Sequence, residues 1–293
     1  MDSPLTSVVV PVFNDPDGLE TTVGSLLDQT AEGYEVVIAD NGSTDRTVRV
    51  AERFARDDRV VHVVEDDVRG SYAARNAGIE AAEGDVIGFL DADMWVERDY
   101  VESIGRAMRS DDRVYMGCDV VVVDEDTPTT RFNAATGFPV RNYVEALRFV
   151  PTCCLVVDRC VFEAVGDFDG RVVSGGDVEF GHRVANAGYE LAFEPEIVLY
   201  HPARATARAL VSKWFRVGRG DEQLRRYYPG RFDERSPFGW RSLLPGHPDA
   251  FADRLRIEPS STVEFTYWFL LDWACQLSRT AGRIDQYVTS RLR

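Results

Sequence analysis

Four short apolar runs, separated by helix-forming stretches, fill the first 93 residues and constrain the fold more than any other feature. The runs are rich in Val and Ile, so both of their faces should be buried. The intervening stretches carry apolar residues at helical spacing, as at Leu19, Val23 and Leu26. Such alternation predicts an α/β fold, with a mainly parallel sheet flanked by helices. The expected strands cover 6–15, 34–45, 59–66 and 85–93, and the expected helices cover 18–30, 46–56 and 71–82.

The pattern changes beyond residue 113. Longer apolar runs at 113–126 and 150–166 predict strands of a mixed sheet, with a loop near 125–150 between them. After Tyr200 the chain is rich in Arg and aromatic residues and then mostly helical. No repeat or low-complexity linker interrupts the first part, which predicts one domain over 1–230 and a helical C-terminal extension over 231–293.

The C-terminal extension contains an aromatic and apolar stretch at 265–277, interrupted by Asp272. Its 13 residues are fewer than the roughly 20 that span a bilayer. Two interpretations stay open. Trp, Tyr and flanking arginines favour peripheral contact with a membrane interface, whereas the apolar content alone favours packing within the protein or oligomerisation.

The composition is strongly acidic, with a formal net charge of −16 and a single lysine, Lys213, beside 32 arginines. This charge repels phosphate backbones, so nucleic acid is not an expected partner. Acidic, lysine-poor surfaces are also typical of proteins from salt-loving microbes, although a GC-rich genome alone replaces Lys with Arg. We expect a halophilic protein.

Neither the cysteines nor the N-terminus indicates export. The five cysteines form no CxxC motif and no paired metal spacing, and most lie beside apolar residues, which predicts buried reduced thiols. The N-terminus has no basic leader segment and leads directly into a strand. We therefore expect a cytoplasmic protein.

Acidic and amide side chains lie at the carboxyl ends of three of the expected strands, at Asn14–Asp15, Asp40–Asn41 and Asp91–Asp93. Ligands of such sheets bind beyond the carboxyl ends of the strands. Two carboxylates spaced i and i+2 on an extended segment point the same way and can hold a divalent cation. The alternative for Asp91 and Asp93 is an ordinary strand end, where Asp favours the turn.

The order of these motifs resembles that of the family 2 glycosyltransferases, which have the GT-A fold. The motifs are VVVPVFN, ADNGSTD, RGSYAARNAGI, DAD, VGDFDG, SGGDVEFGHRVANAG and VLYHPAR. They extend from residue 6 to about residue 205, roughly two thirds of the chain. The resemblance implies an enzyme that transfers a sugar from a nucleotide diphosphate sugar with inversion.

For the metal, the resemblance implies that Asp91 and Asp93 bind Mg²⁺ or Mn²⁺, which bridges the donor diphosphate. His201 corresponds to a third metal ligand in several GT-A enzymes. A histidine after a strand also suits a purely structural role.

For the nucleoside, the resemblance implies that Asp40 accepts a hydrogen bond from the base imide, which favours uridine. Arg75 would reach a base carbonyl, Asn76 would lie beside the nucleotide and support the loops, and Pro11 and Phe13 would line the nucleoside slot. The structural alternatives are an Asx turn for Asp40, a solvated surface position for Arg75, and core or turn roles for Pro11 and Phe13.

For the reaction, the resemblance implies that Asp177 is the base that takes the proton of the acceptor hydroxyl. The residue before it is Gly176, where the family usually has Glu, so the acceptor contacts stay open. The alternative for Asp177 is a helix cap. Arg216 and Arg219, in a loop-like stretch at 213–220, would close over the diphosphate; a surface amphipathic helix is the alternative there.

The sequence thus predicts a metal-dependent inverting glycosyltransferase. Its donor would be a UDP-sugar, and its acceptor a hydroxyl of a saccharide or lipid-linked saccharide used in surface glycan assembly, at the cytoplasmic face of the membrane. One alternative is a non-catalytic nucleotide-sugar or carbohydrate-binding protein of the same fold. Another is a sugar-phosphate nucleotidyltransferase, whose Gly-rich N-terminal loop this sequence lacks.

Overall fold

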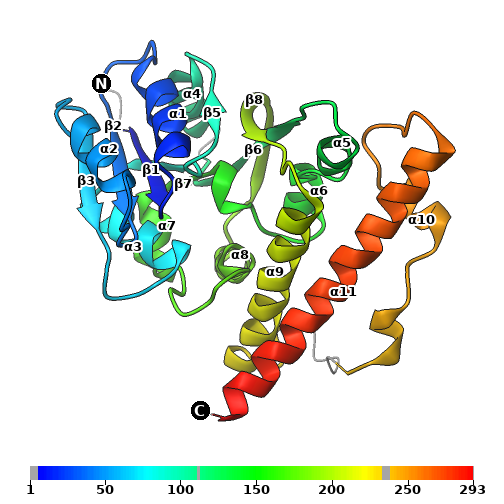
Figure 1. Ribbon diagram of the computed structural model, residues 1–293. Coiled ribbons are helices and arrows are strands. Elements are labelled where there is room, and N and C mark those ends of the chain that lie inside the picture. Colours follow the sequence, from blue (N-terminus) through cyan, green and yellow to red (C-terminus); the bar gives the residue numbers. More distant parts are fainter. Residues whose placement is uncertain (1–5, 111–112, 233–237, 293) are drawn as a thin grey trace. The chain divides into compact units, whose positions relative to one another are not determined.

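The computed structural model describes residues 6–110, 113–232 and 238–292 (Figure 1). The prediction that the N-terminus has no leader segment concerns residues 1–5 in part, and these lie outside the described residues. The chain divides into two compact units. The first comprises the residues up to Val121, Phe138–Arg171 and Gly176–His201, and the second comprises Val122–Gly137, Val172–Gly175 and the residues from Pro202 onward. The domain boundary expected after residue 230 stays a prediction.

A mixed sheet is the frame of the first unit. Its strands in the described residues are β1 (Thr6–Val12), β2 (Tyr34–Asp40), β3 (Val60–Val64), β4 (Val86–Phe89), β5 (Trp95–Val96), β6 (Tyr115–Val123), β7 (Leu155–Asp158) and β8 (Ala192–Pro202). They lie in the order β3-β2-β1-β4-β7-β6-β8-β5. Strands β3, β2, β1 and β4 are parallel, whereas β7 runs antiparallel to β4 and β6, and β5 antiparallel to β8. The predicted α/β fold class is confirmed.

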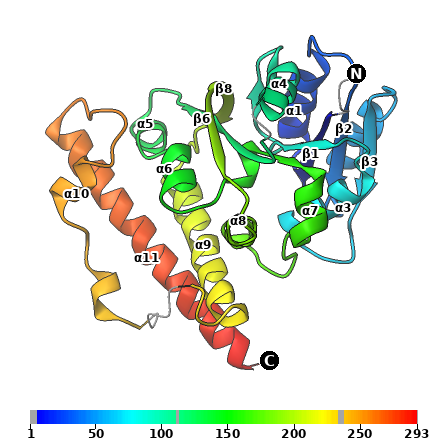
Figure 2. The same ribbon diagram turned by 180° about the vertical axis from the view of Figure 1, so that it is seen from behind.

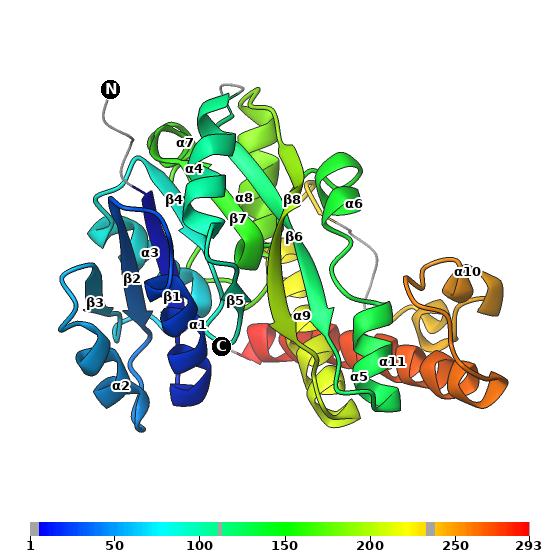
Figure 3. The same cartoon turned by 90° about the horizontal axis from the view of Figure 1, so that it is seen from above.

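Helices cover both faces of the parallel strands (Figures 1 and 3). The helices of this unit are α1 (Pro16–Leu27), α2 (Thr47–Phe54), α3 (Ser71–Ala81), α4 (Tyr100–Ser110), α6 (Val140–Glu145), α7 (Arg159–Val165) and α8 (Gly176–Asn186). Crossovers between parallel strands are right-handed. The connections from β1 to β2 and from β2 to β3 therefore place α1 and α2 on one face of the sheet. The connection from β3 to β4 runs in the opposite direction across the sheet and places α3 on the other face. A Cβ on Gly78 would lie 2.4 Å from Cγ1 of Val9, so this glycine lets α3 pack directly on β1.

The expected long strand at 150–166 is wrong. A 3-10 turn, η1 (Thr152–Cys154), precedes the short β7, and α7 follows at once. Asp158 ends the strand because its side chain accepts a hydrogen bond from the Cys160 N–H and so caps α7. The expected loop at 125–150 also contains two helices, α6 and α5 (Pro128–Ala135).

Two long helices, α9 (Ala207–Tyr227) and α11 (Thr262–Leu292), lie side by side in the second unit (Figures 1 and 2). Glycines allow this close approach. A Cβ on Gly218 would lie 1.9 Å from the carbonyl oxygen of Arg279, and one on Gly282 would lie 2.0 Å from that of Phe215. The expected loop at 213–220 is therefore wrong, because these residues belong to α9 and their glycines serve helix packing.

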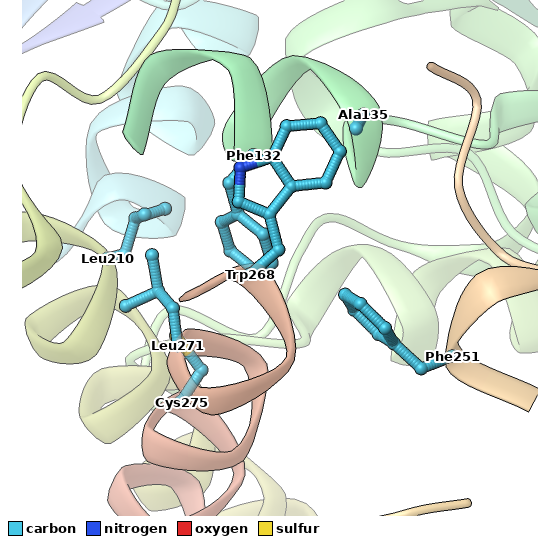
Figure 4. Close-up of a cluster of buried hydrophobic side chains, with 7 residues drawn as sticks. All are labelled: Phe132, Ala135, Leu210, Phe251, Trp268, Leu271 and Cys275. Carbon is cyan, nitrogen blue, oxygen red and sulfur yellow. The ribbon is translucent and has the colours of Figure 1, made fainter. Parts of the chain in front are cut away.

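A hydrophobic cluster joins these two helices to α5 and α10 (Pro248–Ala252) (Figure 4). Its buried residues are Phe132, Ala135, Leu210, Phe251, Trp268, Leu271 and Cys275. Part of the apolar stretch at 265–277 thus packs within the protein, while Val263, Tyr267 and Leu270 are exposed on α11. Among the described residues, no helix is both long enough and apolar enough to cross a bilayer.

The cysteines are free thiols. Cys118, Cys153, Cys154 and Cys275 are buried, as predicted, whereas Cys160 is exposed. Burial raises the pKa of Cys275 to about 12, so this thiol stays protonated at neutral pH.

Candidate active site

The carboxyl ends of β1 and β2 are joined by hydrogen bonds between the loops that follow them. Asn14 adopts a left-handed φ of +51°. Its N–H donates to Oγ of Ser43 (2.9 Å), and its Oδ1 accepts from the N–H of Thr44 (2.8 Å). Asp40 is almost fully buried, and its Oδ1 accepts from the N–H of Ser43 (2.9 Å) in an Asx turn. Its Oδ2 lies 3.9 Å from Nε2 of His62, a nitrogen that is buried without a hydrogen-bond partner in the described part of the chain.

Asn41 holds the segment that leads into α3. Its amide nitrogen donates to the carbonyls of Glu65 and Val68 (2.9 Å each), and its Oδ1 accepts from the N–H of Gly70 (2.7 Å). Gly70 has a φ of +142°, a conformation that favours glycine, and α3 begins at the next residue. The end of β2 therefore fixes where α3 starts.

Pro11 and Phe13 differ in exposure. Pro11 is buried within β1 opposite Ala39. The Phe13 ring is 50% exposed, and the guanidinium of Arg69 lies over it at 5.1 Å. Phe13 thus offers an apolar surface beside Asn14, whereas Pro11 is part of the sheet.

Asp91 and Asp93 do not lie on an extended strand, contrary to the sequence expectation. Strand β4 ends at Phe89, and the N–H of Met94 donates to the carbonyl of Asp91 (3.2 Å), which closes a turn. The turn sends the two carboxylates to different partners. Asp91 accepts from Nη2 of Arg75 (2.5 Å), and Oδ1 of Asp93 lies 3.9 Å from Nε2 of His201.

Pairing of β5 with β8 brings Asp93 and His201 together. Trp95 pairs with Tyr200, and their rings stack at 5.7 Å. Ligand atoms that share an octahedral ion at about 2.1 Å lie roughly 3 to 4 Å apart. The 3.9 Å between Oδ1 of Asp93 and Nε2 of His201 therefore suits a shared cation. Within the described residues no three His, Cys, Asp or Glu side chains cluster as a metal site, and Asp91 is paired with Arg75. The oxygen and nitrogen donors of Asp93 and His201 are of types that bind a divalent cation, whereas the role of Asp91 as a metal ligand stays a prediction.

Arg75 is buried on α3 and is not the solvated side chain of the alternative interpretation. It is 4% exposed, and besides Asp91 it donates to the carbonyl of Ser71 (3.3 Å). Its Nε is buried and has no hydrogen-bond partner in the described part of the chain. The next residue, Asn76, exchanges hydrogen bonds with both backbone groups of Phe168 (2.8 and 3.2 Å) and so supports that loop.

Asp177 lies in the first turn of α8 and is partly buried. Its Oδ1 accepts from the hydroxyl of Tyr72 (3.1 Å) and from the N–H of Val178 (3.0 Å). Burial raises the pKa of Asp177, while these hydrogen bonds and the nearby charge of Arg75 oppose the rise. A partly buried carboxylate with a raised pKa suits a general base.

Glu179 serves a structural role. It is fully buried and paired with Arg183 at 2.9 Å. Arg183 also donates to the carbonyls of Gly166 (3.0 Å) and Asp167 (2.6 Å). The pair therefore anchors the VGDFDG stretch to α8.

Arg216 and Arg219 lie on α9, in the second unit. Arg216 donates to the carbonyl of Val173 (3.1 Å). Arg219 donates to Gln286 (3.3 Å) and lies 3.4 Å from a carboxylate oxygen of Asp285, both on α11. Their expected contact with the diphosphate stays a prediction.

Sequence reasoning missed two side chains, Tyr72 and His62. Tyr72 precedes Arg75 by three residues, so helical spacing could have placed both on one face of α3. His62 faces Asp40 from the neighbouring strand, a pairing that depends on the register of β2 with β3.

The model of the family described as "Glycosyl transferase family 2" matches residues 7–164, which include β1 to β4, α3 and the Asp91–Asp93 turn. The chain belongs to glycosyltransferase family 2. This glycosyltransferase is 31% identical to "Glycosyltransferase AglE" of Haloferax volcanii over 302 residues, which cover 98% of this chain and 97% of AglE.

Two solved structures share the fold of this glycosyltransferase. The mannosyltransferase PcManGT from Pyrobaculum calidifontis, in complex with GDP-Man and Mn²⁺, has a TM-score of 0.64 at 18% identity and covers 96% of this chain and 87% of its own. TarS 1–349 of S. aureus has a TM-score of 0.56 at 16% identity, with coverage of 98% and 91%. The GT-A fold is confirmed, and membership of the family sets aside the nucleotidyltransferase and binding-protein alternatives.

Proposed function

We propose that this glycosyltransferase is metal-dependent and inverting. It moves a sugar from a nucleotide diphosphate sugar to a hydroxyl of a saccharide or lipid-linked saccharide acceptor. One observation carries the proposal: two side chains from the first turns of α3 contact the carboxylates of the site. Arg75 binds Asp91, and Tyr72 binds Asp177. A donor-side and an acceptor-side carboxylate thus both contact the N-terminal part of one helix.

Asp177 acts as the base. Its carboxylate takes the proton of the acceptor hydroxyl as that oxygen bonds to C1 of the sugar, and the bond from C1 to the diphosphate oxygen breaks. Because the pKa of Asp177 is raised, its carboxylate is a better proton acceptor than that of an ordinary aspartate.

Asp91, Asp93 and His201 would hold the cation. A bound Mg²⁺ or Mn²⁺ supplies positive charge that stabilises the leaving diphosphate. In a protein of net charge −16, carboxylates alone would repel that diphosphate. Arg75 contributes a second positive charge at the same turn.

Asp40 recognises the base through the oxygen that does not bond Ser43. A carboxylate accepts from the imide N–H of uracil, and equally from the N1–H of guanine. A UDP-sugar is our first candidate donor. A GDP-sugar is the second, because a protein of the same fold is seen in complex with GDP-Man and Mn²⁺.

The acceptor belongs to surface glycan assembly in this proposal. Support for it comes from resemblance to the family and from the exposed apolar side chains Val263, Tyr267 and Leu270 of α11, which suit peripheral contact with a membrane that carries a lipid-linked saccharide.

A panel of UDP- and GDP-sugars tests this function. We expect one donor to raise the melting temperature only when Mn²⁺ or Mg²⁺ is present, and to be hydrolysed or transferred with release of the nucleoside diphosphate. The matched control is Asp177→Asn, which should keep the thermal shift and lose turnover. A donor-induced rise in melting temperature that is unaffected by EDTA would contradict the metal dependence.

A further inference from the structure

Tyr72 is joined to Asp177 by two hydrogen bonds, although the two residues are 105 positions apart. The hydroxyl of Tyr72 donates to Oδ1 of Asp177 (3.1 Å) and accepts from the Asp177 N–H (3.3 Å). A hydroxyl has one donor and two acceptor sites, so both bonds can form together. The side chain and the backbone of Asp177 are thus held by the same atom.

Gly176 packs directly against the ring of Tyr72. A Cβ at position 176 would lie 2.8 Å from Cε2 and Cζ of that ring, closer than real Cβ contacts. The ring has little room to withdraw, because Tyr72 is 5% exposed, packs against Phe168 (5.7 Å between centroids) and lies under the Arg75 guanidinium (5.6 Å). Tyr72 therefore occupies the space in which the resemblance to the family predicts a glutamate side chain.

We propose that Tyr72 is the positioning residue for Asp177, that Gly176 is required because the Tyr72 ring fills the space beside it, and that Oδ2 of Asp177 is the atom that takes the proton. The proposal rests on the proposed role of Asp177 as base. It assigns α3 a direct part in acceptor activation, in addition to its contact with Asp91.

The choice of Oδ2 follows from the hydrogen bonds of the carboxylate. Tyr72 and Val178 both donate to Oδ1, and within the described residues no side chain or N–H donates to Oδ2. Two donors on Oδ1 hold the carboxylate in one orientation and leave the lone pairs of Oδ2 for the acceptor hydroxyl. They also favour the ionised form, which counteracts the effect of burial on the pKa of Asp177.

The first test is the pH dependence of kcat for Tyr72→Phe, with UDP-glucose or GDP-mannose and Mn²⁺. We expect kcat at neutral pH to fall by roughly tenfold. The acid limb of the profile should move to higher pH, because a carboxylate without this donor protonates more readily. The KM for the donor should stay unchanged. A purely structural role would lower kcat without moving the limb, and an unmoved limb would contradict the proposal.

A second readout does not need turnover. The ¹³C resonance of the Asp177 carboxyl, assigned by its absence in Asp177→Asn, reports its pKa directly. Tyr72→Phe should raise this pKa. The matched control is Tyr100→Phe, since the Tyr100 hydroxyl is also buried but has no hydrogen-bond partner in the described residues. An equal pKa in wild type and Tyr72→Phe would overturn the proposal.

Gly176→Ala tests the packing of Gly176 against the Tyr72 ring. The added methyl group must displace the ring, so we expect the same shift of the acid limb as in Tyr72→Phe, and little further shift when the two changes are combined. Fully additive shifts would show that Gly176 does not act through Tyr72.

Failure of this proposal and failure of the proposed function give different results. If Asp177→Asn turns over nearly as fast as wild type, Asp177 is not the base and both fail. If Asp177→Asn is inactive while the pKa of Asp177 is the same in Tyr72→Phe, only the role of Tyr72 fails.

Discussion

At the scale of single residues, each carboxylate of the candidate site has a different polar or charged partner. Arg75 neutralises Asp91, Asp93 faces His201, and Asp177 is held by hydrogen bonds from Tyr72 and Val178. Motif spacing could predict the carboxylates, because each follows a strand or opens a helix. Helical spacing could place Tyr72 beside Arg75, but it could not predict the contact of Tyr72 with Asp177, because that contact depends on how closely α3 packs beside α8.

Asp93→Asn should weaken metal binding. The variant loses the carboxylate that faces His201, so the Mn²⁺ concentration for half-maximal activity should rise by roughly 10- to 100-fold. The control is Asp17→Asn, because Asp17 is an exposed carboxylate of α1 in a surface ion pair with Arg46. An unchanged Mn²⁺ requirement in Asp93→Asn would show that this residue is not a ligand.

The pH dependence of the wild type follows from Asp177. Its pKa is raised by burial, so the fraction in the ionised, basic form falls at a higher pH than for an ordinary aspartate, whose pKa is about 3.9. Activity should therefore rise with pH through this raised pKa and then level off. A kcat profile without an acid limb above the ordinary aspartate range would contradict the assignment.

At the scale of elements, the sequence predicted the parallel strands and α1 to α3 well, because their apolar pattern is local. It failed at 150–166 and 213–220. In the first, an apolar run was divided by the Asp158 cap into a strand and a helix. In the second, the stretch expected to be loop-like is part of α9, as the helical alternative had it, and Gly218 allows close contact with α11, a partner far along the chain.

Gly218→Ala should destabilise the packing of α9 on α11. Its methyl group would lie 1.9 Å from the carbonyl oxygen of Arg279, so the helices must separate, at a cost of about 1–3 kcal/mol in the free energy of unfolding. Gly24→Ala is the matched control. It lies within α1 with no atom within 4 Å of the added Cβ, and should stabilise the protein by about 0.5–1 kcal/mol. Equal urea midpoints for the two variants would contradict this account of the helix contact.

At the scale of the whole molecule, the charge of −16 bears on stability as well as on donor binding. Like charges repel in the folded state, and concentrated salt screens that repulsion. We therefore expect a higher melting temperature in molar KCl than in dilute buffer. Greater stability in dilute buffer would contradict a halophilic interpretation of the composition.

Asp177 is the proposed base of this glycosyltransferase, and the donor binds elsewhere in the site. The most direct measurement compares Asp177→Asn with wild type for two quantities, the Kd of the nucleotide sugar with Mn²⁺ and the kcat of transfer. We expect a Kd that stays the same and a kcat that falls by roughly 10²- to 10⁴-fold, the typical contribution of a general base. A variant with nearly normal kcat would show that Asp177 is not the base.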